Sequence, residues 1–192
     1  MKMQDLQYVL TGKMPLLMNN PSCMGSGTEA PKMKGPADNL SPEDQAKIRV
    51  YANPDGILYI PSEWVVLSIQ YAGKGRKIGK TAIAPLIPTC VFTKTDRFAL
   101  LDKKGKPVTE YVVFVKPVHV GKGRILRGRP MVRDWKVAVE ISIDTEVITP
   151  EIVDQLLERA GLIGGMGDYS PFVTPHKRTA GPYGTYTVER AK

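Results

Sequence analysis

Acid–base chemistry in this chain would depend on the segment around His176, one of only two histidines in 192 residues. Lys177 follows directly, and Tyr169 lies seven residues earlier. Metal-independent cleavage of RNA needs a base for the ribose 2′-hydroxyl proton and an acid for the leaving oxygen, and these three side chains are candidates for both roles. A lone histidine beside Lys177 and Arg178 is more often a phosphate contact. We therefore predict no catalytic residue and keep His176, Tyr169 and Lys177 as the alternative.

Metal and cofactor sites are not indicated by the sequence. No group of His, Cys, Asp and Glu has the spacing of a ligand set, and Cys23 and Cys90 fit neither a zinc site nor a disulfide framework. Residues 73–81, GKGRKIGKT, are similar to the phosphate-binding loop G-x-x-x-x-G-K-[ST]. The spacing differs, because Gly75 leaves three residues before the second glycine and Gly73 leaves five. We expect no metal and no cofactor.

Basic residues are concentrated in two segments of a chain whose net charge is +8. Residues 64–95 and 111–133 contain none of the 19 acidic residues. Segregated positive charge is the usual footprint of a polyanion, and the planar guanidinium of arginine both pairs with phosphate and stacks on bases. Trp135, just after the second segment, is a candidate stacking platform. We predict nucleic-acid contacts at Lys74, Arg76, Lys77, Lys80, Lys122, Arg124, Arg127, Arg129 and Arg133.

A helix followed by a glycine-rich loop is predicted near the C-terminal end. Thr149 suits the N-cap and Pro150 the first helical position. Apolar residues then recur at helical spacing up to Gly161, where we expect a left-handed C-cap. Three glycines follow within four residues, at Gly164, Gly165 and Gly167. Because glycine lets a partner's backbone come close, we predict that this loop touches a ligand, with Lys177 and Arg178 supplying charge. A plain connector is the alternative.

Hydrophobic periodicity and turn signals predict a mixture of strands and helices. Strands are expected at residues 2–11, 57–60, 85–93, 111–120, 136–143 and 183–188, and helices at 41–52, 62–72 and 149–161. We interpret 111–120 and 136–143 as one hairpin with a long basic tip at 121–130. This order predicts an α+β, ferredoxin-like or RRM-like fold, an antiparallel sheet with helices on one face. We expect a single domain, residues 1–192, with 19–40 as a flexible loop insert.

Four short motifs resemble the repeat-associated (RAMP) superfamily, which includes RNA-binding backbone subunits and guide-RNA-processing ribonucleases of CRISPR systems. The motifs are Met14–Met18, Leu58–Ser62, Gly-Asp-Tyr-Ser-Pro at 167–171 and Gly-x-Tyr-x-Val at 184–188. The resemblance implies a ferredoxin-like fold, RNA binding or metal-independent RNA cleavage, and subunits side by side along a strand. The chain also looks like small phage-encoded proteins of this shape, which would place it in the cytoplasm of a bacterial host.

These observations predict a non-catalytic protein that binds single-stranded DNA or RNA. Segments 74–80 and 122–133 would hold phosphates, and the glycine-rich loop would let the strand approach. The alternatives are a metal-independent endoribonuclease that uses His176, and a phage structural or host-protein-interaction protein. No stretch approaches the roughly 18 apolar residues of a membrane helix, and the N-terminus lacks an apolar signal core. We therefore expect a cytoplasmic protein without a membrane partner.

Overall fold

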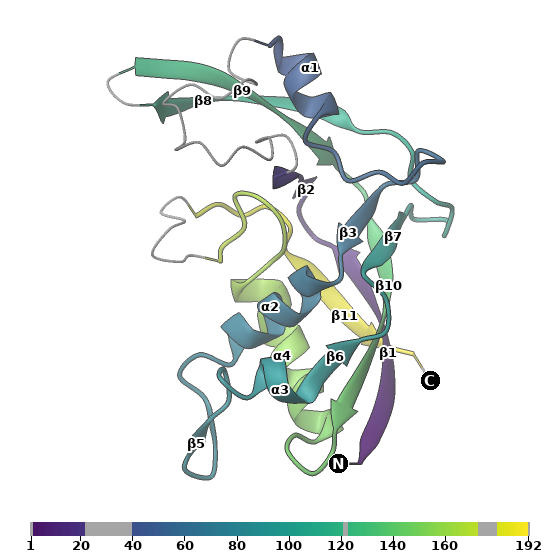
Figure 1. Cartoon of the computed structure of the whole chain (residues 1–192), viewed down its shortest axis with the longest axis vertical. Helices are drawn as coiled ribbons and strands as arrows, with labels where there is room; N and C mark the ends of the chain where they lie inside the picture. The colour runs from purple at the N-terminus through teal and green to yellow at the C-terminus, as the bar shows by residue number, and fades with distance from the viewer. Residues whose placement is uncertain (1, 22–39, 121–122, 173–179, 192) are drawn as a thin grey trace, which may run out of the picture.

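A six-stranded antiparallel sheet forms one layer of the protein, and helices cover one of its faces. The computed structural model describes residues 2–21, 40–120, 123–172 and 180–191 (Figure 1). The strands are ordered β11-β1-β10-β7-β3, and β6 also pairs with β10. Their bounds are β1 Met3–Gly12, β3 Tyr59–Pro61, β6 Val91–Thr93, β7 Arg97–Leu101, β10 Lys136–Asp144 and β11 Tyr186–Arg190.

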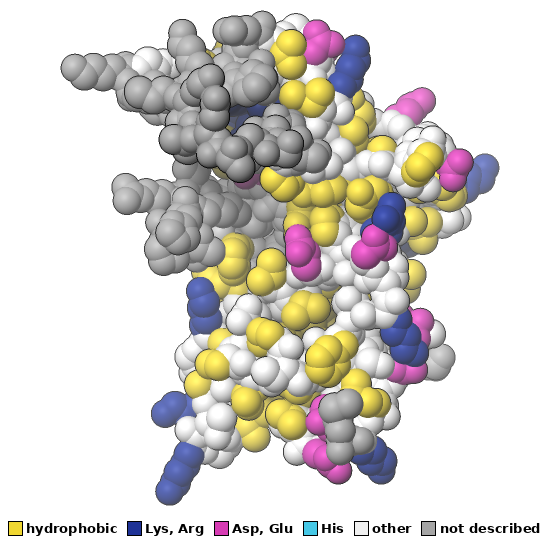
Figure 2. Space-filling model, viewed as in Figure 1, with side chains coloured by type: hydrophobic (Ala, Val, Ile, Leu, Met, Phe, Trp, Pro, Cys, Tyr) yellow, Lys and Arg dark blue, Asp and Glu magenta, His cyan; other side chains and the backbone are white. Residues whose placement is uncertain are grey.

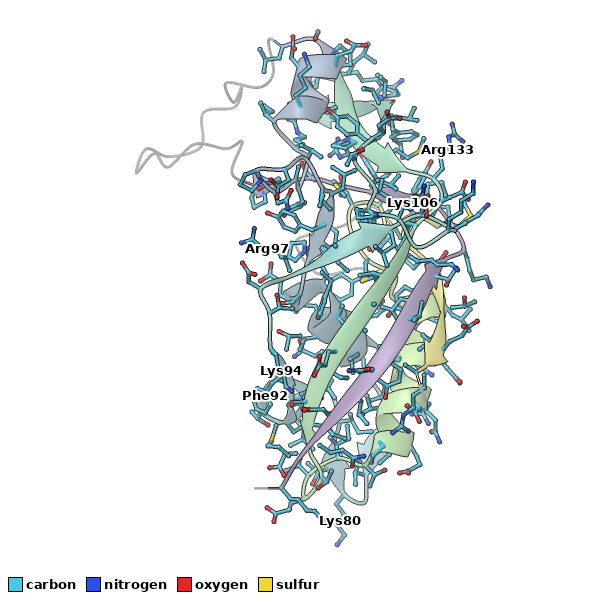
Figure 3. All side chains as sticks on the ribbon, turned by 90° about the vertical axis from the view of Figure 1, so that its right-hand side faces the viewer. Lys80, Phe92, Lys94, Arg97, Lys106 and Arg133 are labelled. Carbon is cyan, nitrogen blue, oxygen red and sulfur yellow. The ribbon has the colours of Figure 1, made fainter. Side chains whose placement is uncertain are left out.

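The chain order of these elements is that of a ferredoxin-like fold. Strand β1 is followed by α2 (Glu63–Ala72), β6, β10, α4 (Pro150–Ile163) and β11. In the sheet the same strands lie in the order β11-β1-β10-β6, which is the antiparallel arrangement of two interleaved strand–helix–strand units. Figure 3 shows β1 and β10 in front of the helices. The prediction of an α+β, ferredoxin-like sheet with helices on one face is confirmed.

The core lies between this sheet and the two long helices. Alternate residues of β1 point inward, and Leu6, Tyr8 and Leu10 are all buried, as the period-two pattern predicted. On α4 the buried residues recur at helical spacing from Val153 to Ala160. The Tyr8 hydroxyl donates to Asp154 Oδ1 at 2.6 Å, so β1 and α4 are joined by a polar contact as well as by apolar packing.

A second, three-stranded sheet extends from the end of the first. It is ordered β2-β9-β8, with bounds Leu16–Leu17, Gly123–Val132 and Val112–Val120. Helix α1 (Pro42–Lys47) packs on β9, and the amide of Gly128 donates to Gln45 Oε1 at 3.2 Å. The Ser41 hydroxyl accepts from the Asp44 amide at 3.1 Å and caps the N-terminus of α1. In the chain, β2 and α1 lie between β1 and β3, and β8 and β9 lie between β7 and β10.

The predicted pairing of 111–120 with 136–143 is wrong. Strand β8 pairs with β9 from Val112↔Met131 to Val120↔Gly123, whereas β10 pairs with β1 and β6. Residues 123–130 of the predicted basic tip therefore belong to strand β9. The reason is that both candidate partners of β8 have strand character, but β10 carries buried residues at every second position and completes the main core. Residues 121–122 lie outside the described residues.

Some element boundaries also differ from the prediction. Helix α1 ends at Lys47 instead of Ala52. The Arg49 amide donates three residues back, to Ala46 O at 3.0 Å, and Gln45 O accepts from Arg49 Nη1 at 2.9 Å. Residues 85–93 contain a short helix, α3 (Ile87–Cys90), before β6. Pro88 lies in its first turn, where a missing amide hydrogen costs nothing. The last strand begins at Tyr186 rather than at residue 183.

Gly161 is not a helix cap. It lies inside α4, which runs to Ile163, and the C-cap Gly164 has φ −100°. A Cβ on Gly161 would lie 2.2 Å from the Tyr186 carbonyl oxygen. The glycine is therefore explained by the close packing of α4 on β11, rather than by a left-handed turn. Most of the predicted insert at residues 19–40 lies outside the described residues.

Candidate nucleic-acid interface

The glycine-rich loop, residues 164–172, is held by the protein's own backbone. Gly167 has φ +76°, and its Cβ would lie 2.4 Å from the Leu17 carbonyl oxygen. The Asp168 amide donates to that same oxygen at 2.9 Å, and the Met166 amide donates to Gly184 O at 3.0 Å. Gly164 and Gly165 are buried. The close approach that these glycines permit is therefore an approach of other segments of this chain, and not the predicted approach of nucleic acid.

One face of the β8–β9 hairpin meets this loop. Because side chains alternate across a strand, the register places Phe114, Lys116, Arg127 and Arg129 on the same face. The Nε of Arg129 forms an ion pair with Asp168 Oδ2. Lys116 Nζ lies 4.3 Å and Arg129 Cζ 5.1 Å from the ring centroid of Tyr169. The structure thus brings together the second basic segment and the glycine-rich loop.

Two cations on this face are direct cross-strand neighbours. Lys116 lies opposite Arg127 in the register, and both side chains are half-buried. Like charges directly opposite each other destabilise an antiparallel pair. This face of the hairpin therefore concentrates positive charge. We call Lys116, Arg127 and Arg129 the hairpin cation row.

Lys74 is the described cation of the first basic segment that lies beside the glycine-rich loop. Tyr71 and Phe172 have ring centroids 4.5 Å apart in a T-shaped arrangement, and Lys74 Nζ lies 4.6 Å from the Tyr71 ring and 5.7 Å from the Phe172 ring. Phe172 is the last described residue of the loop before residue 180. Lys74 and the hairpin cation row therefore flank the same loop from two sides.

The other cations of the first segment lie elsewhere. Arg76 Nη2 donates to Gln155 Oε1 of α4 at 3.4 Å. Lys77 and Lys80 are exposed in the small hairpin of β4 (Lys77–Ile78) and β5 (Thr81–Ala82). That hairpin lies at the opposite end of the molecule from β8 and β9 (Figures 1 and 3). The two basic segments do not form one continuous patch.

Three predicted contacts of the second segment have different surroundings. Arg124 is exposed and lies on the other face of β9, the face on which α1 packs near Gly128. Arg133 is exposed after the end of β9 and is visible with Lys106 on the side drawn in Figure 3. Lys122 lies outside the described residues.

Trp135 is a core residue. Its ring is 2% exposed, and its Nε1 donates to the Met14 carbonyl oxygen at 3.0 Å. A Cβ on Gly12 would lie 2.3 Å from that nitrogen, so the indole packs flat on the backbone of β1. No face of the ring is available for a base, and the prediction of a stacking platform is wrong. Gly12 was the sequence feature connected with this contact. A glycine predicts close packing only where the partner residue is known.

Of the three candidates for acid–base catalysis, only Tyr169 lies within the described residues. Tyr169 is 7% exposed and has φ 51°, and it is buried between the hairpin and the loop. His176, Lys177 and Arg178 lie outside the described residues. Within the described part of the chain, no cluster of three or more His, Cys, Asp or Glu is arranged to hold a metal ion. In the same part, no helix combines the length and the apolar character that crossing a membrane requires.

A cavity of about 340 Å³ opens between α2 and the glycine-rich loop. Three aromatic rings line it, those of Tyr51, Trp64 and Phe172, and its charged residues are Glu63 and Asp168. No lysine or arginine is among the described residues that line it. Hydrophobic side chains gather over the middle of this side of the molecule, and Lys and Arg lie mainly at its edges (Figure 2). Sequence reasoning missed the cavity because segments far apart in the chain build it.

The open face of the main sheet is a poor surface for phosphates. Its exposed Lys94 forms ion pairs with Asp5 at 2.5 Å and with Glu140 at 3.0 Å. Both carboxylates belong to this face, and the hydrogen bonds from Lys94 and Ser142 hold the pKa of Asp5 below its usual value. The cation is therefore already neutralised. RNA-recognition folds use aromatic residues on such a sheet, but here the acidic groups argue for the loop and the hairpin instead.

Comparisons with known proteins give little further information. No family model matches the chain, and no curated protein matches it. Among solved structures, a crystal structure of Cmr6 from Pyrococcus furiosus matches with a TM-score of 0.44 and 12% sequence identity, and the match covers 96% of this chain and 97% of that one. The fold assignment rests on the strand order described above. Membership of the RAMP superfamily stays a prediction.

Proposed function

We propose that the protein binds single-stranded DNA or RNA and does not cleave it. The observation that carries the proposal is the hairpin cation row, in which Lys116 faces Arg127 across the strands, while Arg129 beside them is already paired with Asp168. Phosphates are the groups that best relieve such a concentration of positive charge, because each contact also releases counterions from the nucleic acid. The segment from residue 111 to 133 contains no acidic residue.

Aromatic side chains next to the cations favour a single strand over a duplex. Phe114 and Tyr183 have ring centroids 5.4 Å apart, and both are half-buried beside the hairpin. Tyr71 and Phe172 form a second pair, under Lys74. Single strands expose base faces that stack on such rings, whereas a duplex hides them. In the proposed complex the strand runs from the hairpin cation row, past the glycine-rich loop, to Lys74.

Further contacts belong to the same proposal. Lys177 and Arg178 follow Phe172 in the sequence by five and six residues, and we include them as phosphate contacts. Side-by-side copies along a strand, which the resemblance implies, are likewise a proposal. Among the described residues, no specific contact favours cleavage of the strand or an acidic protein partner.

The test is a salt series with a double variant and a charge-matched control. Lys116→Gln with Arg127→Gln should weaken binding of a single strand and lower the slope of log K against log salt by about 1.4, since each lost phosphate contact contributes about 0.7. Lys104→Gln with Lys106→Gln removes the same charge from an exposed turn and should keep the wild-type slope. An equal decrease in both variants would mean that only net charge matters, and the proposed surface would be wrong.

A further inference from the structure

We infer that the cavity between α2 and the glycine-rich loop holds one unstacked base of the bound strand. The inference rests on the proposed function and assigns a role to residues that the electrostatic argument does not use. A cavity of about 340 Å³ lies at the small end of the range of ligand sites in proteins, about 300–1,000 Å³. A nucleobase is a ligand of the size that such a cavity takes.

The aromatic residues of the cavity suit a flat ring. Tyr51 holds Trp64 edge to face, with centroids 5.3 Å apart and planes at 83°. Phe172 also lines the cavity, and its ring packs in a T-shaped arrangement with Tyr71. Trp64 and Phe172 are only half-buried, although large aromatic rings gain most from complete burial. Both rings are thus fixed by a neighbour and leave part of their surface for a ligand.

The charged residues of the cavity suit a base and repel a phosphate. Among the described residues that line the cavity, the charged ones are Glu63 and Asp168, and a carboxylate accepts hydrogen bonds but cannot donate them. Glu63 is exposed in the first turn of α2. It is far in the sequence from the cations of the β8–β9 hairpin. A group with N–H donors fits this lining, and guanine offers two adjacent donors on its Watson–Crick edge. We therefore expect guanine to be preferred over uracil.

The position of the cavity agrees with the path proposed for the strand. Asp168 lines the cavity and pairs with Arg129 of the hairpin cation row. Phe172 also lines it, and its ring centroid lies 5.7 Å from Lys74 Nζ. The described cations Arg129 and Lys74 thus flank the cavity. A strand whose phosphates follow these cations would pass over the opening and could turn one base into it.

The experiment compares strands that differ at one position. Single-stranded RNA of about 12 nucleotides, all uridine except for a central guanosine, is titrated with the wild-type protein. A second strand has an abasic linker in place of the guanosine, and DNA versions of both are run in parallel. We expect the abasic strand to bind about tenfold more weakly with the same salt slope, because a stacked base is lost and no phosphate contact changes.

Protein variants test the same contact from the other side. Trp64→Ala and Phe172→Ala should each lose about tenfold in affinity for the guanosine strand and little for the abasic strand. Trp64→Phe keeps a ring and should bind nearly as the wild type. Phe92→Ala is the matched control, because Phe92 is an exposed aromatic residue on the far side of the sheet (Figure 3), and its affinity should not change.

Two negative results have different meanings. If the wild-type protein binds the guanosine and abasic strands equally well, the base site is wrong and the proposed function stands. If it binds none of the strands at low salt, the proposed function fails and the base site fails with it. Because the abasic comparison uses the wild-type protein, an unfolded variant cannot hide either result.

Discussion

At the scale of single residues, two glycines with nearly the same backbone conformation have different surroundings. Gly167 has φ +76° and Gly75 has φ +75°. A Cβ on Gly167 would lie 2.4 Å from the Leu17 carbonyl oxygen and 3.1 Å from Leu16 Cδ1, whereas a Cβ on Gly75 would have no neighbour within 4 Å. Comparing alanine at Gly75 and at Gly167 therefore separates the free-energy cost of a left-handed backbone from the cost of a steric clash.

The two alanine variants should therefore differ in stability. Gly75→Ala should lower the free energy of unfolding by about 1–2 kcal/mol, the cost of a left-handed conformation for a residue with a Cβ. Gly167→Ala should cost a further 1–3 kcal/mol, roughly the penalty for overpacking. Urea unfolding monitored by circular dichroism measures both. Equal losses would show that the glycine-rich loop does not pack on Leu17 as described.

Cys90 gives a prediction that depends on pH. Burial, and to a smaller degree the carboxylate of Asp144, raise the pKa of this thiol to about 11. The side chain is completely buried, so in a Cys23→Ala background a thiol reagent at pH 8 should react only after denaturation. Because the folded pKa is raised, the contribution of Cys90 to stability is complete below about pH 9 and is lost as the pH rises toward 11. Rapid labelling of the native protein at pH 8 would contradict this burial.

At the scale of elements, the hairpin and the glycine-rich loop are joined by Arg129 and Asp168. Their side chains are 12% and 19% exposed. Removing one partner leaves the other charge largely buried, which usually costs more than the pair contributes. The link therefore matters for the position of the loop relative to the hairpin cation row.

Breaking this link should be costly. Arg129→Met should lower the free energy of unfolding by about 2–4 kcal/mol, and adding Asp168→Asn should recover part of the loss, because the uncompensated charge is then removed. The exposed pair Lys103–Asp134, with side chains 73% and 63% exposed, is the control. Lys103→Met should cost no more than about 0.5 kcal/mol. Equal effects in chemical denaturation would contradict the proposed link.

The same elements show what the sequence could predict. Local signals placed most of the elements correctly: Ser41 and Pro150 mark real helix starts, and the alternation of Leu6, Tyr8 and Leu10 gave the buried face of β1. Strand pairing is not local. Both β9 and β10 have the pattern of partners for β8, and the choice depends on which strand completes the core.

The candidate site was predictable only in part, for the same reason. Charge counts identified the β8–β9 segment, and composition identified the glycine-rich loop. Neither predicts that Arg129 meets Asp168, because that contact joins residues 39 positions apart. Trp135 looked like an exposed ring beside basic residues, although it packs on β1. The cavity at Trp64 needs α2, the loop and Tyr51 together.

At the scale of the whole molecule, the β4–β5 hairpin and the β8–β9 hairpin lie at opposite ends of the long axis (Figure 1). The β4–β5 hairpin carries Lys77 and Lys80, far from the hairpin cation row, whereas Lys74 of the same segment lies beside a ring of the glycine-rich loop. A strand that follows the loop would leave the β4–β5 end unoccupied.

Removing charge from the β4–β5 hairpin should therefore have little effect on the salt dependence of binding. Lys77→Gln with Lys80→Gln should change the salt slope by less than about 0.7, the value for one phosphate contact with a single strand, whereas Lys116→Gln with Arg127→Gln should change it by about twice as much. Anisotropy titrations in a salt series measure both slopes. Equal changes would mean that the strand spans the length of the molecule.

The central claim is that a single strand is bound and left intact. The most direct measurement is a titration of the wild-type protein with labelled single-stranded RNA, single-stranded DNA and duplex DNA across a salt series, followed by a denaturing gel of the bound strands. We predict salt-sensitive binding that is tighter for a single strand than for the duplex, with uncut products. Cleaved RNA would contradict the non-catalytic account and favour the His176 alternative, and the absence of binding at low salt would contradict the claim altogether.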